Sequence, residues 1–141
     1  MRCKEIMKRD VESISPLDTV QRAAQKMRDG KIGFLPVCDR RMRVVGAVTD
    51  RDLTIRVLAD GEPASTTVRE VMTQECVWCQ PEDPLHKAEE IMARNHKSRI
   101  MCIDQSGVLV GVISLSDIAQ SEEGNRASRT LRKVSEREVR I

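Results

Sequence analysis

The stretch Gly46–Asp52, which reads GAVTDRD, decides how this chain is organised. It returns in altered form 65 residues later at Gly111–Asp117, which reads GVISLSD. In each copy an apolar run ends at a Thr or Ser, and an Asp follows three residues later. A hydroxyl residue with an acid three positions further on is typical of a capping box at a helix start. The two stretches therefore predict two equivalent local structures, each a strand leading into a helix.

The similarity extends outward from these stretches over most of the chain. Residues 3–54 align without a gap on residues 68–119. The identical pairs are spread along both copies and are Glu5/Glu70, Met7/Met72, Pro16/Pro81, Asp18/Asp83, Ala23/Ala88, Met27/Met92, Asp39/Asp104, Val45/Val110, Gly46/Gly111 and Asp52/Asp117. An ungapped match of this length indicates an internal duplication, so both repeats are expected to fold alike.

Each repeat is predicted to form a β-α-β-β-α unit after a short helical turn. The strands are expected at Val11–Ile14, Phe34–Cys38 and Arg43–Val48, and again at Cys76–Cys79, Arg99–Ile103 and Val108–Ile113. Asp18 and Asp83 are the expected N-caps of the first helices, with Pro84 as the first helical residue. Gly30 and Asn95 are expected to end these helices in the left-handed conformation. The predicted buried faces are Val20, Ala23, Ala24 and Met27, then Leu85, Ala88, Ile91 and Met92.

A second helix in each repeat is expected to begin at the tetrad, running from Thr49 or Asp50 to about Ala59 and from Ser114 to about Gln120. The chain then divides into a first unit at residues 1–61, a linker at 62–67, a second unit at 68–120 and a charged tail at 121–141. The tail is expected to be partly helical and to pack weakly on the body or on a partner subunit. The weak apolar stripe behind this expectation is Ala127, Leu131, Val134 and Ile141. A basic interaction tail is the alternative, and Glu122, Glu123, Glu136 and Glu138 count against it.

The composition indicates a soluble folded protein and excludes several classes. With 33% charged and 40% apolar residues, the 141-residue chain is one domain or two very small ones. A net charge of +2 does not favour nucleic acid or an anionic membrane, and Phe34 and Trp78 are the only aromatic residues. No apolar run approaches the roughly 20 residues that a membrane span needs, and the N-terminus does not resemble a signal peptide. A cytoplasmic location is the expectation.

Cys76 and Cys79 form a Cys-x-x-Cys pattern, which permits a metal or redox hypothesis. The first repeat has Val11 and Ile14 at these positions, so the cysteines are interpreted as apolar strand residues. No second close Cys/His pair completes a zinc site, and neither disulfides nor a metal are expected. Neither His stands at a suggestive spacing from a nucleophile, so the chain is not expected to be an enzyme.

Two longer motifs carry a resemblance to a known family. Phe34–Asp39 reads FLPVCD and Val44–Asp52 reads VVGAVTDRD, with counterparts at Ile100–Asp104 and Leu109–Asp117. These motifs resemble those of the CBS domain family, and residues 3–119 as a whole resemble a tandem CBS pair, or Bateman module. The resemblance implies an α/β (α+β) fold, with two tandem β-α-β-β-α units packed through their sheets around a pseudo-two-fold axis.

The resemblance also implies a function. Such pairs are non-catalytic regulatory modules that bind AMP, ADP, ATP or S-adenosylmethionine in clefts between the units, need no other cofactor and form homodimers. The target protein regulated in this way is unknown. The competing hypothesis is a structural or interaction subunit whose clefts hold no nucleotide.

By position in the family motif, Thr49 and Asp52 would hold ribose and phosphate in one site, and Ser114 and Asp117 in the other. A carboxylate suits ribose hydroxyls, whereas hydroxyl groups and the N–H groups at a helix start suit phosphate. The expected phosphate partners are Arg51 and Arg99, and the expected base pocket is Ile14, Phe34, Pro36, Cys79 and Met101. Met101 stands where the first repeat has Pro36, so equal occupancy of the two sites is not expected. Capping alone would also explain both tetrads.

Overall fold

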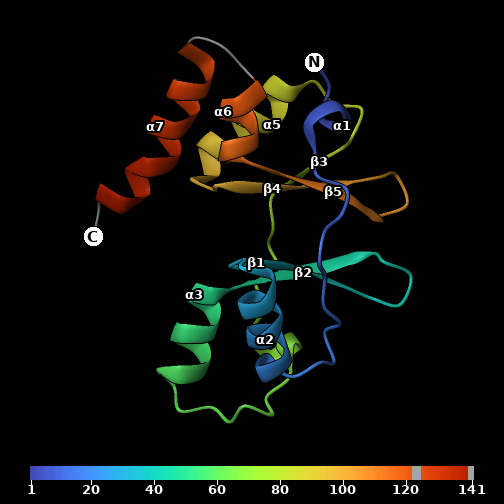
Figure 1. The fold of residues 1–141 in the computed structure, drawn as a ribbon, viewed down its shortest axis with the longest axis vertical. Coiled ribbons are helices and arrows are strands. Elements are labelled where there is room, and N and C mark those ends of the chain that lie inside the picture. Colours follow the sequence, from blue (N-terminus) through green and yellow to red (C-terminus); the bar gives the residue numbers. More distant parts are fainter. Residues whose placement is uncertain (122–124, 140–141) are drawn as a thin grey trace. The chain divides into compact units, whose positions relative to one another are not determined.

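The computed structural model describes residues 1–121 and 125–139, which form two compact units (Figure 1). One unit consists of Glu12–Cys76 and is called here the Asp52 unit. The other consists of Met1–Val11 together with Val77–Ile141 and is called the Asp117 unit. The units therefore differ from the sequence repeats, because the segment that opens each repeat folds with the other repeat.

The Asp52 unit is built on a small antiparallel sheet. Its elements are α2 (Val20–Gly30), β1 (Phe34–Cys38), β2 (Val44–Thr49), α3 (Asp50–Leu53), η1 (Thr54–Leu58) and α4 (Val68–Val71). Phe34 in β1 pairs with Thr49 in β2. Ile14 adds a parallel bridge to Val37, and Thr73 adds an antiparallel bridge to Ala47. The strand predicted at residues 11–14 is thus a single bridge, and η1 is a π-helical turn rather than a continuation of the predicted α-helix.

The Asp117 unit has a similar arrangement of elements, with a three-stranded sheet in place of the two-stranded one. Its elements are α1 (Cys3–Ile6), β3 (Trp78–Cys79), α5 (Leu85–Asn95), β4 (Arg99–Ile103), β5 (Leu109–Ser114), α6 (Leu115–Ser121) and α7 (Asn125–Val139). The strand order is β3-β4-β5, with β3 parallel and β5 antiparallel to β4. Lys8 bridges Val112 in β5 just as Thr73 bridges Ala47 in β2. The predicted α+β fold with two similar units is confirmed.

The predicted helix ends are displaced by one residue. The N-cap positions are Thr19 and Pro84, not Asp18 and Asp83, and Thr19 Oγ1 accepts a hydrogen bond from Arg22 N–H at 3.1 Å. Asp83 instead accepts from Gln80 N–H and closes the preceding turn. The left-handed residues are Lys31 (φ 54°) and His96 (φ 55°), each one position after the predicted Gly30 or Asn95.

Each unit has its own apolar core. The buried core of the Asp52 unit is Ile14, Val20, Ala23, Met27, Leu35, Val37, Val48, Val68, Val71 and Met72. That of the Asp117 unit is Cys3, Met7, Cys79, Leu85, Ala88, Met92, Ile100, Cys102, Ile113, Ile118 and Val134. The predicted helix faces are confirmed apart from Ala24, which is exposed, and Ile91, which is half-buried and packs against the core.

The tail forms α7, which packs against α5 and α6 (Figure 1). Val134 is only 3% exposed and joins the core, whereas Leu131 is 54% exposed. The tail thus contains a helix that contacts the body, where the expectation was weak packing on the body or on a partner subunit. Leu131, which the sequence placed on the same apolar face as Val134, is exposed. Ala127, Ile141 and the four glutamates of the tail lie outside the residues whose side chains the structure describes. Within residues 1–121 and 125–139, no helix has the length and hydropathy needed to cross a bilayer.

Candidate functional site

The tetrad of the Asp52 unit forms a complete capping box between β2 and α3. Thr49 Oγ1 accepts a hydrogen bond from Asp52 N–H at 3.1 Å, and Asp52 Oδ2 accepts one from Thr49 N–H at 2.9 Å. The bond from Thr49 N–H holds the Asp52 carboxylate in one orientation, and the Asp52 side chain is 13% exposed. The predicted cap is confirmed, and the second carboxylate oxygen, Oδ1, lies outside it.

The tetrad of the Asp117 unit has the same geometry between β5 and α6. Ser114 Oγ accepts from Asp117 N–H at 3.2 Å, and Asp117 Oδ2 accepts from Ser114 N–H at 2.9 Å. The Asp117 side chain is 10% exposed. Ser114 Oγ also lies 2.9 Å from Ser116 Oγ. Two nearly buried carboxylates are therefore held alike, one in each unit.

A cation faces the outer oxygen of Asp52. Arg56 Nε lies 3.9 Å from Asp52 Oδ1, while Arg56 Nη1 donates hydrogen bonds to the carbonyl oxygens of Val71 at 3.0 Å and Met72 at 3.2 Å. These carbonyls belong to the end of α4 and its C-cap, where a guanidinium is well placed. Arg56 was not among the predicted residues, although its position four residues after Asp52 is a recognisable helical pairing.

A different cation faces the outer oxygen of Asp117. Lys8 Nζ lies 3.5 Å from Asp117 Oδ1, and the Lys8 side chain is 73% exposed. Lys8 N–H donates to Val112 O at 2.9 Å, and Val112 N–H donates to Lys8 O at 3.0 Å. Sequence reasoning missed Lys8 because no local pattern connects it to Asp117. Only the bridge to β5 brings them together.

Glycine in each tetrad motif allows the edge segment to approach. A Cβ on Gly46 would lie 2.7 Å from Thr73 O and 3.0 Å from Met72 Sδ. A Cβ on Gly111 would lie 2.7 Å from Met7 Cγ and Sδ and 3.0 Å from Lys8 O. A side chain at either position would collide with the segment that pairs beside it, so the glycines are required by packing rather than by an unusual backbone conformation.

This duplicated architecture matches the CBS domain model at residues 3–59 and 68–124. The chain belongs to the CBS domain family. It is 34% identical over 125 residues to the CBS domain-containing protein YhcV of Bacillus subtilis (strain 168), and the match covers 89% of this chain and 88% of YhcV.

Solved structures of other CBS proteins share the fold. The crystal structure of hypoxic response protein I, which has two coordinated zinc ions, gives a TM-score of 0.79 with 29% identity and covers 87% of this chain and all of that one (100%). The CBS domain pair of protein MJ0100, in complex with 5′-methylthioadenosine and S-adenosyl-L-methionine, gives 0.76 with 21% identity over 86% of this chain and 94% of that one. The structure of CBSX2 in complex with AMP gives a TM-score of 0.75 with 19% identity, and it covers 85% of this chain and 94% of that one.

The strand register of this CBS protein places two further predicted residues beside the tetrads. Phe34, half-buried, pairs with Thr49, and Arg99, exposed, pairs with Ser114. Arg51 is exposed on α3. The other predicted base-pocket residues have almost no accessible surface and are Ile14, Pro36, Cys79 and Met101. Of the predicted base-pocket side chains, Phe34 is therefore the accessible one.

The thiols of the Asp117 unit form a buried row rather than a reactive Cys-x-x-Cys pair. Cys79 Sγ lies 3.7 Å from the Sγ atoms of both Cys3 and Cys102, and all three side chains are buried. The hydrogen bond with Cys102, and then burial, raises the pKa of Cys79 to about 12, and the contact with Cys79 together with burial raises the pKa of Cys3 still further. Thiols held protonated at neutral pH are poor nucleophiles and poor metal ligands. Among the described residues, no group of three or more His, Cys, Asp or Glu side chains is arranged to hold a metal ion.

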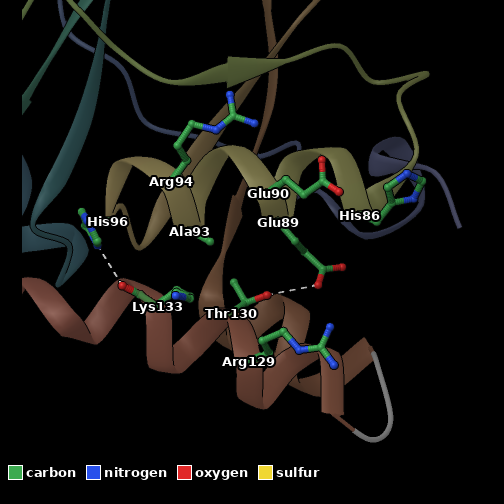
Figure 2. Close-up of a pocket in the computed structure, with 9 residues that line it drawn as sticks. All are labelled: His86, Glu89, Glu90, Ala93, Arg94, His96, Arg129, Thr130 and Lys133. Atoms are coloured by element: carbon green, nitrogen blue, oxygen red, sulfur yellow. Dashed lines mark hydrogen bonds between the residues drawn. The ribbon is translucent and has the colours of Figure 1, made fainter.

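A cavity of about 580 Å³ lies along the contact between α5 and α7 (Figure 2). Thr130 Oγ1 on α7 donates a hydrogen bond to Glu89 Oε2 on α5 at 3.2 Å, and His96 Nδ1 donates to Lys133 O at 2.8 Å. Figure 2 shows these two contacts bridging the helices. None of the predicted ligand-binding residues lines the cavity, which marks a polar helix contact and not the tetrad sites.

Proposed function

We propose that this CBS protein is a regulatory module that binds adenosine-containing ligands, with AMP, ADP, ATP and S-adenosylmethionine as the candidates. The observation that carries the proposal is the matching pair of carboxylates. Asp52 and Asp117 are both nearly buried, each with Oδ2 held by a backbone N–H and Oδ1 facing a cation. Solved CBS pairs in complex with 5′-methylthioadenosine, S-adenosyl-L-methionine and AMP support the ligand class.

The chemistry of the tetrads suits a ribose. Asp52 Oδ1 and Asp117 Oδ1 are acceptors whose direction is set in advance by the capping box, so binding costs little reorganisation. Two neighbouring ribose hydroxyls would donate charge-assisted hydrogen bonds to such an oxygen. Arg51 and Arg99 would meet the phosphates, and Phe34 would contact the base.

The module is proposed to bind without catalysis. The hydroxyl oxygens of Thr49 and Ser114 accept backbone hydrogen bonds within the caps, and a hydroxyl nucleophile would need an adjacent base. The two histidines of the chain, His86 and His96, would be candidates for such a base, but both line the α5–α7 cavity. Regulation would follow if a ligand favours one arrangement of a homodimer or of a target complex over another.

A structural role is the second candidate, and one observation favours it. Both capping boxes are complete without any ligand, so helix capping alone accounts for the four tetrad residues. In that case the chain would be an interaction subunit, and nucleotides would not stabilise it.

Thermal unfolding with each candidate ligand separates the two functions. A ligand present at a hundred times its Kd should stabilise the protein by about 2.7 kcal/mol, which raises Tm by about 8 °C for a chain of this size. Asp52→Asn and Asp117→Asn, tested separately and together, keep an acceptor for the cap but remove the charge. The double variant should lose the ligand response.

A third capping box provides the control. Thr67 and Glu70 form one at the start of α4, where no ligand is proposed, so Glu70→Gln should lower Tm slightly and leave the ligand response intact. If no adenosine-containing ligand shifts the wild-type Tm, the structural role stands. The oligomeric state is measured in the same samples by light scattering, where a monomer would contradict the proposed homodimer.

A further inference from the structure

We infer that Lys8 binds the phosphate of a 5′-phosphorylated adenosine ligand whose ribose is held at Asp117. This site therefore prefers nucleotides to uncharged nucleosides. The inference rests on the proposed function and deepens it at one of the two sites. Lys8 lies in neither tetrad motif, and it reaches Asp117 from the segment that opens the other repeat.

The backbone of Lys8 is fixed beside the site. Its N–H and C=O both pair with Val112 in β5, at 2.9 and 3.0 Å. Gly111, next to Val112, has no side chain to push this segment away, whereas a Cβ at that position would lie only 3.0 Å from Lys8 O. The starting point of the Lys8 side chain is therefore set by the same motif that supplies Ser114 and Asp117.

The side chain of Lys8, by contrast, extends into solvent. It is 73% exposed, and the 3.5 Å separation between Nζ and Asp117 Oδ1 is longer than the roughly 2.7–2.9 Å of a tight charge-assisted hydrogen bond. Because the ammonium lies in solvent, water screens its contact with the nearly buried Asp117 and hydrates Nζ when the two groups separate. Lys8 thus neutralises Asp117 weakly and remains available for a stronger anion.

Binding of a nucleotide would replace the contact between Lys8 and Asp117 with contacts from each of these side chains to the ligand. When ribose hydroxyls donate to Asp117 Oδ1, they take the place of the ammonium on that oxygen. The hydroxyls and the 5′-phosphate belong to the same small sugar, and the flexible four-carbon stem of Lys8 lets Nζ turn from the carboxylate to the phosphate. A ligand without a phosphate would displace Lys8 and offer it no new partner.

The Asp52 unit has the same backbone arrangement without this cation. Thr73 N–H donates to Ala47 O at 2.8 Å and Ala47 N–H donates to Thr73 O at 2.9 Å, which matches the bridge of Lys8 to Val112. Arg56, the cation that faces Asp52, is held by two carbonyl oxygens at the end of α4. Thr73 is therefore the natural position for a gain-of-function variant.

The test compares the affinities of AMP and adenosine by calorimetry. In an Asp52→Asn background, which leaves the Asp117 site, Lys8→Gln should weaken AMP about 3- to 10-fold, the range expected for an exposed charge-assisted contact, with adenosine unchanged. Lys8→Arg should keep the AMP preference. Lys4→Gln removes the same charge from the same segment, where Lys4 pairs with Glu82 at 3.1 Å, and should leave the AMP-to-adenosine ratio as it was.

The reciprocal variant gives an independent result. In an Asp117→Asn background, Thr73→Lys should raise the AMP-to-adenosine affinity ratio at the Asp52 site by a similar factor. An unchanged ratio in Lys8→Gln, with both ligands still bound by the parent, would overturn the role of Lys8 and leave the proposed function standing. If the wild type binds neither compound nor any other adenosine-containing ligand, both the proposed function and the inference fail.

Discussion

Gly46→Ala should destabilise this CBS protein more than the equivalent substitution Gly111→Ala. The added Cβ of Gly46→Ala would lie 2.7 Å from the backbone oxygen of Thr73, which must then retreat by about 0.7 Å to reach an ordinary contact. That movement strains the two hydrogen bonds between Thr73 and Ala47, at 2.8 and 2.9 Å. Overpacking costs about 1–3 kcal/mol and each weakened hydrogen bond about 1 kcal/mol, so the expected loss is about 2–4 kcal/mol.

In Gly111→Ala the added Cβ would mainly contact a flexible side chain rather than backbone. Its closest contacts would be the Met7 side chain at 2.7 Å, which can change rotamer, and the backbone oxygen of Lys8 only at 3.0 Å. The expected loss is about 1–2 kcal/mol. Urea unfolding followed by circular dichroism measures both values at one pH and ionic strength.

A third substitution controls for the effect of replacing glycine itself. Gly30 is the last residue of α2, where an added Cβ would meet Ile32 at an ordinary 3.4 Å, so Gly30→Ala should be neutral or stabilise by up to about 1 kcal/mol. The steric argument is refuted if Gly46→Ala lies within about 0.5 kcal/mol of the wild type, or if Gly111→Ala is the more damaging of the two.

Three further predictions concern contacts away from these glycines. Arg56→Met should lower the unfolding free energy by about 1–3 kcal/mol in urea, because it removes both hydrogen bonds to the end of α4; no loss would show that water replaces them fully. Val134→Ala should cost about 1–2 kcal/mol and speed proteolysis within α7, whereas Leu131→Ala, at an exposed position, should do neither; equal effects would contradict the described docking of α7. The pKa of Cys79 is raised from 9.0 to about 12, so the folded state favours the protonated thiol. The free energy of unfolding that this preference contributes is complete below about pH 9 and is lost as pH rises toward 12. Cys79→Ala should therefore lose about 1 kcal/mol less stability than the wild type between pH 8 and pH 10, and parallel losses would refute the raised pKa.

Most secondary structure in this protein could be predicted because it depends on short-range patterns. The strands β1 and β4 occur at the predicted residues, and both tetrads form the predicted capping boxes. At the helix ends the errors are of one residue, because several neighbouring polar residues compete for the same cap. Asp83 illustrates this, since its carboxylate closes the turn before α5 rather than capping the helix itself. Larger errors are the strand predicted at residues 11–14, which is a single bridge, and the helix predicted after Thr49, which becomes π-helical at Thr54.

The environment of the candidate site was less accessible to sequence reasoning. Asp52 and Asp117 were found from their spacing to Thr49 and Ser114, but four of the five predicted base-pocket residues proved to be buried, because family position alone does not report accessibility. Arg56 could have been found from its helical spacing to Asp52. Lys8 could not, since its contact with Asp117 depends on an edge pairing between segments far apart in the chain.

The sequence by itself determined the duplication, the apolar faces of the helices and the two tetrads, because each rests on interactions between residues a few positions apart. Only the tertiary structure decided which segment joins which unit. Lys8, from residues 1–11, pairs with β5 of the Asp117 unit, and Thr73 pairs with β2 of the Asp52 unit, through backbone hydrogen bonds that any residue with an N–H and a C=O can make. Such bonds leave no signature in residue type beyond the glycines that permit them. Two tetrads that are alike in sequence differ in the cation beside them because Lys8 reaches Asp117 through this edge pairing, whereas Arg56 reaches Asp52 from four residues further along the same helical segment.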